Sequence, residues 1–397
     1  MKKVCVNICR LLLAVVLIFS GFVKAFDPMG TQYKIDDYLT AMHLGQMLPD
    51  IASLLVAVAL AALEFSLGVF MLFAIQRRLT SRLVLVIMLV MTPLTLWLAL
   101  ADPIHDCGCF GDAVVLTNWQ TFWKNVVLLA AAVIVALWPK QMFRFVSESN
   151  QWIVINYTIL FVLAIAGWSL YDLPQLDFRP YKVGTDLRDG WQRTWEGEDL
   201  PYADLFLERT DTGEDVTETV LTDEGYTFLL VSPHLEQAND AHFDQINEIY
   251  EYSEVFHYPF YCLTASGPKG INRWQEMTGA EYPFCQTDEI VLKTIIRSNP
   301  GLLLLKDGVI IQKWSHNRLP TVLSMISDPL DRLSIGQQPD DTAARRIARL
   351  LLWFVLPLAL LVVADRTWAW TRWLRRRPKK TQQQEESNHN NNPQQNN

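Results

Sequence analysis

The chain has 397 residues, of which 50% are hydrophobic and 19% are charged, against about 45–50% and about 25% in an average soluble protein. Residues 172–341 hold 30 acidic and 13 basic side chains, whereas the remainder holds 12 acidic and 21 basic ones. This pattern excludes a single soluble domain and is typical of a membrane protein with one extramembrane domain. The acidic charge of that domain argues against nucleic acid as a partner.

Six apolar stretches are long enough to cross a bilayer, which takes about 20 helical residues. We predict spans at about 5–26, 51–75, 83–101, 121–138, 152–171 and 346–364. They divide the chain into a four-helix membrane domain, a fifth helix, an acidic domain, a sixth helix and a tail, at residues 1–138, 139–171, 172–343, 344–366 and 367–397. The first span also resembles a secretory signal peptide ending at Val23-Lys24-Ala25, and its cleavage would leave every later loop on the same side.

The distribution of Lys and Arg among the short loops predicts the orientation of the spans. Basic residues precede span one, separate spans two and three, separate spans four and five, and follow span six: Lys2, Lys3, Arg77, Arg78, Arg82, Lys140, Arg144, Arg372, Arg375, Arg376 and Arg377. We therefore expect a multi-pass protein of the bacterial inner membrane, surrounded by lipid, with residues 172–343 on the periplasmic side. The Gln/Asn-rich end of the chain is expected to be a disordered cytoplasmic tail.

Two cysteines occupy the loop between spans three and four, which this topology places at the outer, oxidising face. Residues two apart lie roughly 5.5–7 Å apart between Cα atoms, within reach of a disulfide, and Gly108 permits a tight backbone. A Cys107–Cys109 bridge is therefore expected, strained and easily reduced. The alternatives are a metal site of His105, Cys107 and Cys109, without the second ligand cluster of a strong zinc pattern, and a turn with structural cysteines.

Glu64 lies in the middle of the second predicted span. An ionisable side chain there costs several kcal/mol and normally faces the bundle interior, where it meets a partner or a proton path. We expect Glu64 to serve a proton path, with a neutral, hydrogen-bonded packing residue as the alternative.

Three stretches resemble the DoxX/MauE family of small four-helix membrane proteins, over about residues 5–138. They are Ser20-Gly21-Phe22-Val23-Lys24-Ala25-Phe26-Asp27-Pro28, Leu63-Glu64-Phe65-Ser66-Leu67-Gly68 and Cys107-Gly108-Cys109-Phe110-Gly111. DoxX-like proteins are linked to quinone-side sulfur oxidation, and MauE-like ones to disulfide formation in a secreted dehydrogenase. The resemblance implies outward thiol chemistry, with quinone as electron acceptor and an exported thiol protein as partner. The sequence has no Gly-rich phosphate loop or haem motif, so no cofactor is evident.

The acidic domain alternates strands and helices in its second half. We predict strands at 227–231, 260–264, 302–305 and 309–314, helices at about 239–255, 271–277 and 289–298, a turn at Asp307-Gly308 and a cis peptide bond at Asn299-Pro300. This order is similar to a thioredoxin-like fold of the secreted redoxin type, over about 184–330.

The sequence differs from thioredoxin-like proteins at the position of their cysteine pair. Such folds carry Cys-x-x-Cys after the strand that precedes the first long helix, where the helix lowers the thiol pKa. This chain has Ser232-Pro233-His234-Leu235 there, with His234 expected in a solvated loop, and we expect Cys262 and Cys285 to be buried.

The sequence therefore predicts an α-helical membrane bundle joined to an extracytoplasmic α/β thioredoxin-like domain without a dithiol. The favoured function is thiol/disulfide electron exchange, or maturation of an exported partner, through Cys107 and Cys109. This would make the chain a thiol-disulfide oxidoreductase-like protein, and whether it is an enzyme stays open. The alternatives are a non-catalytic assembly or binding protein and a small-molecule or proton transporter centred on Glu64.

Overall fold

The computed structural model describes residues 1–44, 49–104, 107–198, 200, 202, 205–320 and 328–376. This part of the chain contains six helices long and apolar enough to cross a membrane, which confirms the six predicted spans. They are α1 (Lys2–Phe26), α3 (Asp50–Phe73), α4 (Arg77–Ala101), α5 (Asn118–Leu137), α6 (Gln151–Tyr171) and α12 (Ala343–Arg376). The chain is a multi-pass membrane protein. His105 and the predicted tail beyond residue 376 lie outside the described residues.

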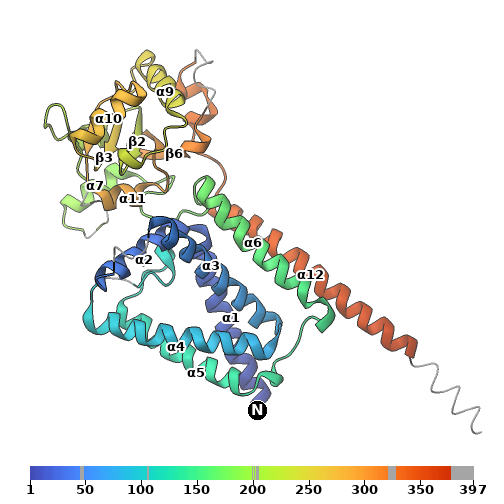
Figure 1. Ribbon diagram of the computed structural model, residues 1–397. Coiled ribbons are helices and arrows are strands. Elements are labelled where there is room, and N and C mark those ends of the chain that lie inside the picture. Colours follow the sequence, from blue (N-terminus) through green and yellow to red (C-terminus); the bar gives the residue numbers. More distant parts are fainter. Residues whose placement is uncertain are drawn as a thin grey trace, which may run out of the picture.

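A shorter helix, α2 (Pro28–Ala41), follows α1 directly and was not predicted. The Asp27 carboxylate accepts a hydrogen bond from the Gly30 backbone N–H at 2.9 Å, and Pro28 occupies the first helical position, where its missing N–H costs nothing. In Figure 1, α2 lies at the end of the bundle nearest the sheet.

Helices α1 and α3 pack in backbone contact because two glycines face the contact. A Cβ atom on Gly21 would lie 2.2 Å from the Phe65 backbone nitrogen, and one on Gly68 would lie 2.6 Å from the Ile18 nitrogen. Small residues at such positions let membrane helices approach closely. The same approach brings the polar side chains next to these glycines within hydrogen-bonding distance.

Helices α6 and α12 form a second helical unit beside the bundle of α1, α3, α4 and α5 (Figure 1). Aromatic rings join the two: Phe354 of α12 lies 4.5 Å from Phe161 of α6 and 5.2 Å from Phe65 of α3 between ring centroids. At the other end of α12, the buried Asp365 carboxylate accepts a hydrogen bond from the Ser147 backbone N–H at 3.0 Å.

The residues between α6 and α12 form a domain around one six-stranded sheet, called the sheet domain below. The strand order is β1-β4-β3-β2-β5-β6; β2, β3 and β4 run parallel, and β1, β5 and β6 pair antiparallel to their neighbours. The strands are β1 (Glu208–Arg209), β2 (Tyr226–Ser232), β3 (Phe260–Thr264), β4 (Phe284–Gln286), β5 (Gly301–Lys306) and β6 (Val309–Ser315). The order β3-β2-β5-β6, with only β3 and β2 parallel, is that of a thioredoxin-like core.

Helices cover both faces of the sheet. One face packs on α9 (Phe243–Val255) and α10 (Pro268–Thr278), and the other on α7 (Leu187–Trp195), α8 (Thr217–Thr222) and α11 (Glu289–Ile295). All seven residues of β2 are buried, as a central strand covered on both faces requires. The four predicted strands, the Asp307-Gly308 turn and the cis Asn299–Pro300 bond are confirmed, whereas β1, β4, α7 and α8 were missed.

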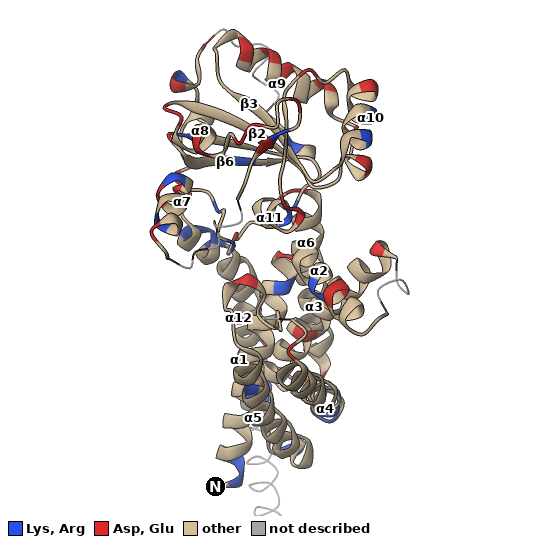
Figure 2. Cartoon of the chain, turned by 90° about the vertical axis from the view of Figure 1, so that its left-hand side faces the viewer, with Lys and Arg blue, Asp and Glu red and all other residues tan. Residues whose placement is uncertain are grey.

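The direction of the helices places two kinds of loop at opposite ends of the bundle. The Cys107–Cys109 loop and α2 lie at the end next to the sheet domain (Figure 1). The N-terminal end of α1, with Lys2 and Lys3, lies at the far end (Figure 2). Because α3 and α5 also run toward that end, the basic α3–α4 and α5–α6 connections lie there too.

The α1–α3 contact predicts that a larger residue at Gly21 lowers stability, whereas the same change at Gly167 does not. Gly21→Val would force a branched side chain into the α3 backbone, and overpacking of this kind costs about 1–3 kcal/mol or more. Gly167→Val on α6 is the matched control, because nothing lies within 4 Å of a Cβ there. We expect a lower melting temperature in detergent for the first variant alone. Equal losses in the two variants would show that α1 and α3 do not depend on this contact.

Candidate functional site

A buried ion pair joins α1 and α3 below the cysteine loop. The Lys24 ammonium lies 2.8 Å and 2.7 Å from the two carboxylate oxygens of Glu64, and both side chains are 5% exposed. Lys24 stands in the last turn of α1, where the helix dipole favours a cation. The predicted intramembrane carboxylate therefore has a partner of opposite charge, and it faces the bundle interior as expected.

Ser20 connects this pair to the cysteine loop. Its hydroxyl oxygen lies 2.7 Å from Glu64 Oε2 and 2.7 Å from the Cys109 carbonyl oxygen. It also accepts a hydrogen bond from the Lys24 ammonium at 3.2 Å. A hydroxyl has one proton, so Ser20 donates to one of the two acceptors at a time. A continuous polar chain thus runs from Glu64 to the backbone of Cys109.

Cys107 and Cys109 form the predicted disulfide, with 5.4 Å between their Cα atoms. Gly108 between them has φ +62°, a left-handed conformation that glycine adopts without a steric penalty. The Tyr38 hydroxyl donates to the Cys107 carbonyl oxygen at 2.5 Å. Among the described residues, no cluster of three or more His, Cys, Asp and Glu could hold a metal ion.

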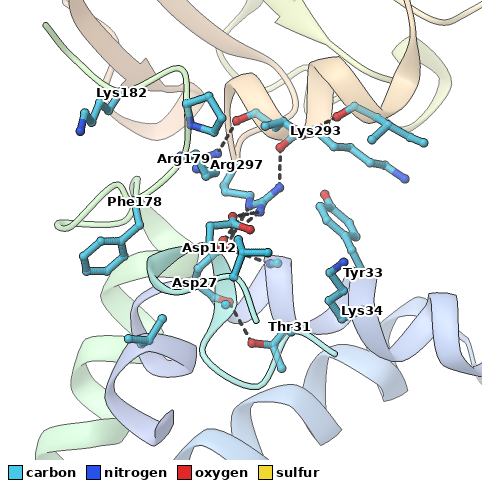
Figure 3. Close-up of a pocket in the computed structure, with 18 of the residues that line it drawn as sticks. Asp27, Thr31, Tyr33, Lys34, Asp112, Phe178, Arg179, Lys182, Lys293 and Arg297 are labelled. Atoms are coloured by element: carbon cyan, nitrogen blue, oxygen red, sulfur yellow. Dashed lines mark hydrogen bonds and ion pairs between the residues drawn. The ribbon is translucent and has the colours of Figure 1, made fainter. Parts of the chain in front are cut away.

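The disulfide loop separates two cavities of different character. On the bundle side, a small recess of about 50 Å³ is lined by both cysteines and by apolar side chains of α2, α3 and α4, namely Ile35, Leu60, Met91, Leu94 and Leu98. On the other side, a cavity of about 650 Å³ lies between the bundle and the sheet domain (Figure 3). Lys24, Thr31, Lys34 and Gly108 line both cavities, so the two meet at the loop.

One arginine of the sheet domain holds the bundle at this cavity. The Arg297 guanidinium donates to the Asp27 carboxylate at 2.9 Å, 3.0 Å and 3.1 Å, and lies 3.5 Å from the Asp112 carboxylate (Figure 3). The Tyr33 ring lies 5.2 Å from the guanidinium and 4.8 Å from the Lys293 ammonium. Asp112 is three residues beyond Cys109, so Arg297 connects α2 with the cysteine loop.

Burial and the Arg297 guanidinium together set the pKa values of Asp27 and Asp112. Burial alone would raise the pKa of Asp27, and the Arg297 guanidinium more than offsets this, so the pKa lies below its usual range. Burial raises the pKa of Asp112, which Arg297 offsets only in part. The pKa of Asp27 is thus lower in the folded state than in the unfolded state. The Arg297–Asp27 contact therefore contributes stability above the usual aspartate range and loses it as the pH falls through the lowered pKa.

The sheet domain has a polar network where a thioredoxin-like fold would carry its dithiol. The Ser232 hydroxyl donates to Asn299 Oδ1 at 2.6 Å, and Asn299 Nδ2 donates to the His234 carbonyl oxygen at 2.9 Å. The His234 ring is not simply solvated, because its Nε2 lies 3.0 Å from a Glu289 carboxylate oxygen. This network joins the end of β2 to the loop that begins at Arg297.

Cys262 and Cys285 are fully buried, as predicted, and belong to the apolar clusters on opposite faces of the sheet. Burial raises the pKa of Cys285 to about 12 and that of Cys262 well above its usual value. A thiol that stays protonated is a poor nucleophile. Cys107 and Cys109 therefore remain the cysteines suited to exchange.

The structure brings together Cys107, Cys109 and Glu64, the three residues singled out from the sequence. Ser20 and Lys24 complete the site and were missed as members of it, although a charged side chain near the end of a span was a usable signal. The sheet-domain contribution from Arg297 carried no signal in the sequence.

Comparisons with known proteins address the two halves of the chain separately. Residues 2–139 match the family described as "Methylamine utilisation protein MauE", which covers less than half of the chain. No curated protein matches the chain. A solution structure of a protein assigned as a disulfide isomerase, from Bacteroides thetaiotaomicron, is similar at 15% identity and a TM-score of 0.25, covering 31% of this chain and 80% of that chain. The likeness to MauE thus covers the helices that carry the disulfide and Glu64.

The Arg297–Asp27 contact predicts that α2 and the cysteine loop become more mobile when this ion pair is removed. Arg297→Ala leaves Asp27 buried without its partner, a change that costs about 3–5 kcal/mol for a buried ion pair. We expect faster amide hydrogen exchange at the start of α2 and in residues 107–113. Arg273→Ala, at an exposed position of α10, is the matched control and should leave both segments unchanged. Unaltered exchange in the Arg297 variant would mean that the loop is held by the bundle alone.

Proposed function

We propose that this protein exchanges electrons between thiols outside the cytoplasm and a membrane quinone, through the Cys107–Cys109 disulfide. The observation that carries the proposal is the polar chain from Glu64 through Ser20 to Cys109, directly below a disulfide. A buried ion pair is costly to keep inside a membrane, and such residues mark functional sites more often than packing sites. The likeness to MauE and to DoxX, which the sequence motifs indicate, agrees with thiol chemistry at this loop.

The proposed reaction balances as two successive exchanges. A thiolate of an exported partner attacks one sulfur of the disulfide, and the other cysteine leaves as a thiolate. A second partner thiolate then attacks the mixed disulfide, so that the partner becomes oxidised and Cys107 and Cys109 become reduced. The cysteine pair passes two electrons and two protons to a quinone, which leaves as quinol. The disulfide is thereby restored.

The surroundings of the loop supply a role for each neighbouring group in this scheme. The Lys24 ammonium lines the same recess as the two sulfurs, and a nearby cation favours the thiolate form of a leaving cysteine. In this scheme Glu64 receives a proton released on oxidation, through the Ser20 hydroxyl that lies between it and the cysteine loop. A quinone would approach from the membrane side, where apolar side chains of α2, α3 and α4 lie beside the cysteines; the recess of about 50 Å³ is itself too small to hold its ring.

The location follows from the same proposal. With the basic loops on the cytoplasmic side, the cysteine loop and the sheet domain would face the periplasm of an inner membrane. A disulfide is stable in that compartment, whereas cytoplasmic thiol systems would keep the pair reduced.

A second candidate function is non-catalytic assembly of exported proteins. It is favoured by the sheet domain, where Ser232-Pro233-His234 replaces a dithiol while the fold is retained. In this case the disulfide would be structural, and the two functions make opposite predictions for cysteine variants. Glu64 is paired with Lys24, an arrangement that offers less support for a transport site.

Sidedness is tested by one cysteine introduced in the sheet domain and one in the predicted cytoplasmic tail. In a Cys5→Ser background, Glu214→Cys should react with a membrane-impermeant thiol reagent once the outer envelope is permeabilised, because Glu214 is exposed on the sheet domain. Gln383→Cys should react only after the inner membrane is broken. The reverse pattern would place the disulfide in the cytoplasm and remove the basis of the proposed reaction.

The redox step is tested by following the oxidation state of the pair in membranes. After mild reduction, Cys107 and Cys109 should reoxidise with added quinone. Because the two cysteines act as a pair, either serine variant should lose thiol oxidation as fully as the double variant.

Glu64→Gln should slow this reoxidation by about 100-fold, a rate loss typical of removing a general acid–base group. Gly108→Val should also weaken function, since φ +62° disfavours a branched residue. Cys5→Ser is the control for protein level, and normal function of both loop serine variants would favour the assembly role.

A further inference from the structure

The sheet domain reverses its charge where it faces the membrane bundle. Residues 172–341 hold 30 acidic and 13 basic side chains, yet the charged residues that this domain contributes to the 650 Å³ cavity are all basic. They are Arg179, Lys182, Lys293 and Arg297, and no described acidic residue of the domain lines the cavity. Figure 2 shows Lys and Arg segments next to Asp and Glu segments on α7 and α11, the helices of the domain that lie nearest the bundle.

The bundle side of the cavity does not cancel this charge. It contributes Lys24 and Lys34 together with Asp27, Asp37 and Asp112. Two of these three carboxylates are already within 3.5 Å of Arg297. Over the described lining, six basic side chains face three acidic ones. Four of the basic residues also have a carboxylate oxygen within 2.9 Å: Lys24, Arg179, Lys293 and Arg297. Lys182 is the basic residue of the sheet-domain wall that has no such partner among the described residues, and an excess of one charge in a cleft concentrates ligands of the opposite charge. The cavity favours an anion.

The size of the cavity indicates a small molecule. Its 650 Å³ lies within the range of about 300–1,000 Å³ that is typical of small-ligand sites. In Figure 3 the labelled basic side chains enter it from the sheet domain above and the Tyr33–Lys34 segment from the bundle below.

The cavity reaches the disulfide loop at Gly108, whereas the two cysteines line the neighbouring recess. Gly108 lines both the cavity and the recess that contains Cys107 and Cys109, and it has no side chain to separate them. A Cβ at Gly108 would lie 2.9 Å from the Lys34 side chain, so the space beside the loop depends on the glycine. A ligand in the cavity therefore lies next to the disulfide turn.

We propose that this cavity binds a small thiol that carries carboxylate groups and presents it to Cys107–Cys109. The inference rests on the proposed thiol exchange and narrows its substrate class. One molecule of the thiolate forms a mixed disulfide and releases one cysteine thiolate. A second molecule displaces the other cysteine, giving the disulfide of the small thiol and a reduced cysteine pair, which the quinone reoxidises. Lys182 binds a carboxylate of the thiol, and Lys293, whose ammonium also lies 2.5 Å from a Glu289 carboxylate oxygen, lines the same site.

The kinetic test uses the full chain in nanodiscs of neutral lipid. The rate of Cys107–Cys109 reduction is measured with 3-mercaptopropionate, which is anionic, and with cysteamine, which is cationic. Each rate is divided by that thiol's rate with a small reference disulfide. The corrected ratio should favour the anion, and Lys182→Glu with Lys293→Glu should lower it by roughly tenfold, as expected for reversed charges near the site.

The matched control reverses two charges of the same sign elsewhere on the domain. Lys269→Glu with Arg273→Glu changes the exposed surface of α10 and should leave the ratio unchanged. Lys182→Glu alone should lower the ratio by a smaller factor. This variant keeps the Lys293–Tyr33 contact, so its effect cannot come from separation of the sheet domain from the bundle. An unchanged ratio in the cavity variants, or an equal fall in the control, would overturn the proposal.

A binding measurement separates this inference from the proposed reaction. In a variant with both Cys107→Ser and Cys109→Ser, calorimetry with 3-(methylthio)propionate, which has no free thiol, should show saturable binding that the lysine reversals weaken about tenfold. Binding without any thiol oxidation in the native chain would refute the reaction and support the site. No binding would overturn the site alone. Displacement of the probe by anionic lipid added to the nanodiscs would identify a lipid headgroup site instead and also overturn the proposal.

Discussion

The buried contact between Lys24 and Glu64 is the interaction on which the rest of the site depends. Removing an ammonium and a carboxylate from water costs several kcal/mol for each ion, unless the two meet in good geometry with further hydrogen bonds. Gly21 and Gly68 make that geometry available, because they let α1 and α3 pack backbone against backbone. Ser20, next to Gly21, then reaches both Glu64 and the Cys109 carbonyl. Helix packing inside the membrane therefore fixes one contact of the cysteine loop, and Arg297 supplies another through Asp112.

The sheet domain shows that a thioredoxin-like fold can keep its binding edge without its chemistry. The end of β2 and the loop before β5 are joined by Ser232, His234 and Asn299, in place of a dithiol. The same loop extends Arg297 to two carboxylates of the bundle. This end of the sheet therefore contacts another part of the same chain. In the proposed reaction, the domain contributes position and charge, and the bundle contributes the reactive sulfurs.

The membrane spans and the longer strands were predictable from the sequence. Bilayer thickness sets the length of the spans, and strand β3 was predicted at its observed bounds, Phe260–Thr264, because its flanking residues are turn formers. Helix α2 was missed because its surface is polar and its apolar residues are few. Strands β1 and β4 have two and three residues, too few for an alternating pattern.

Contacts between distant segments could not be predicted in the same way. Lys24 and Glu64 are 40 residues apart, and Asp27 and Arg297 are 270 residues apart. Single charged residues carry no information about which distant partner they meet. Lys24 was part of a stretch with two interpretations, a span or a cleavage site, and the structure gives it a partner in α3. The disulfide was predictable because its two cysteines are neighbours in the sequence.

The sheet domain is attached to the membrane at both of its ends. It begins directly after α6 ends at Tyr171, and it ends shortly before α12 begins at Ala343; near the first junction, the Asn317 amide donates to the Tyr171 carbonyl oxygen at 2.7 Å. Two short tethers confine the domain to the neighbourhood of the cysteine loop, where its effective concentration relative to the bundle is on the order of millimolar. At such a concentration the contact holds the domain on the loop once its own dissociation constant is below the millimolar range, which corresponds to about 4 kcal/mol. The Arg297–Asp27 contact therefore forms within one molecule and avoids most of the entropic cost of an association between separate chains.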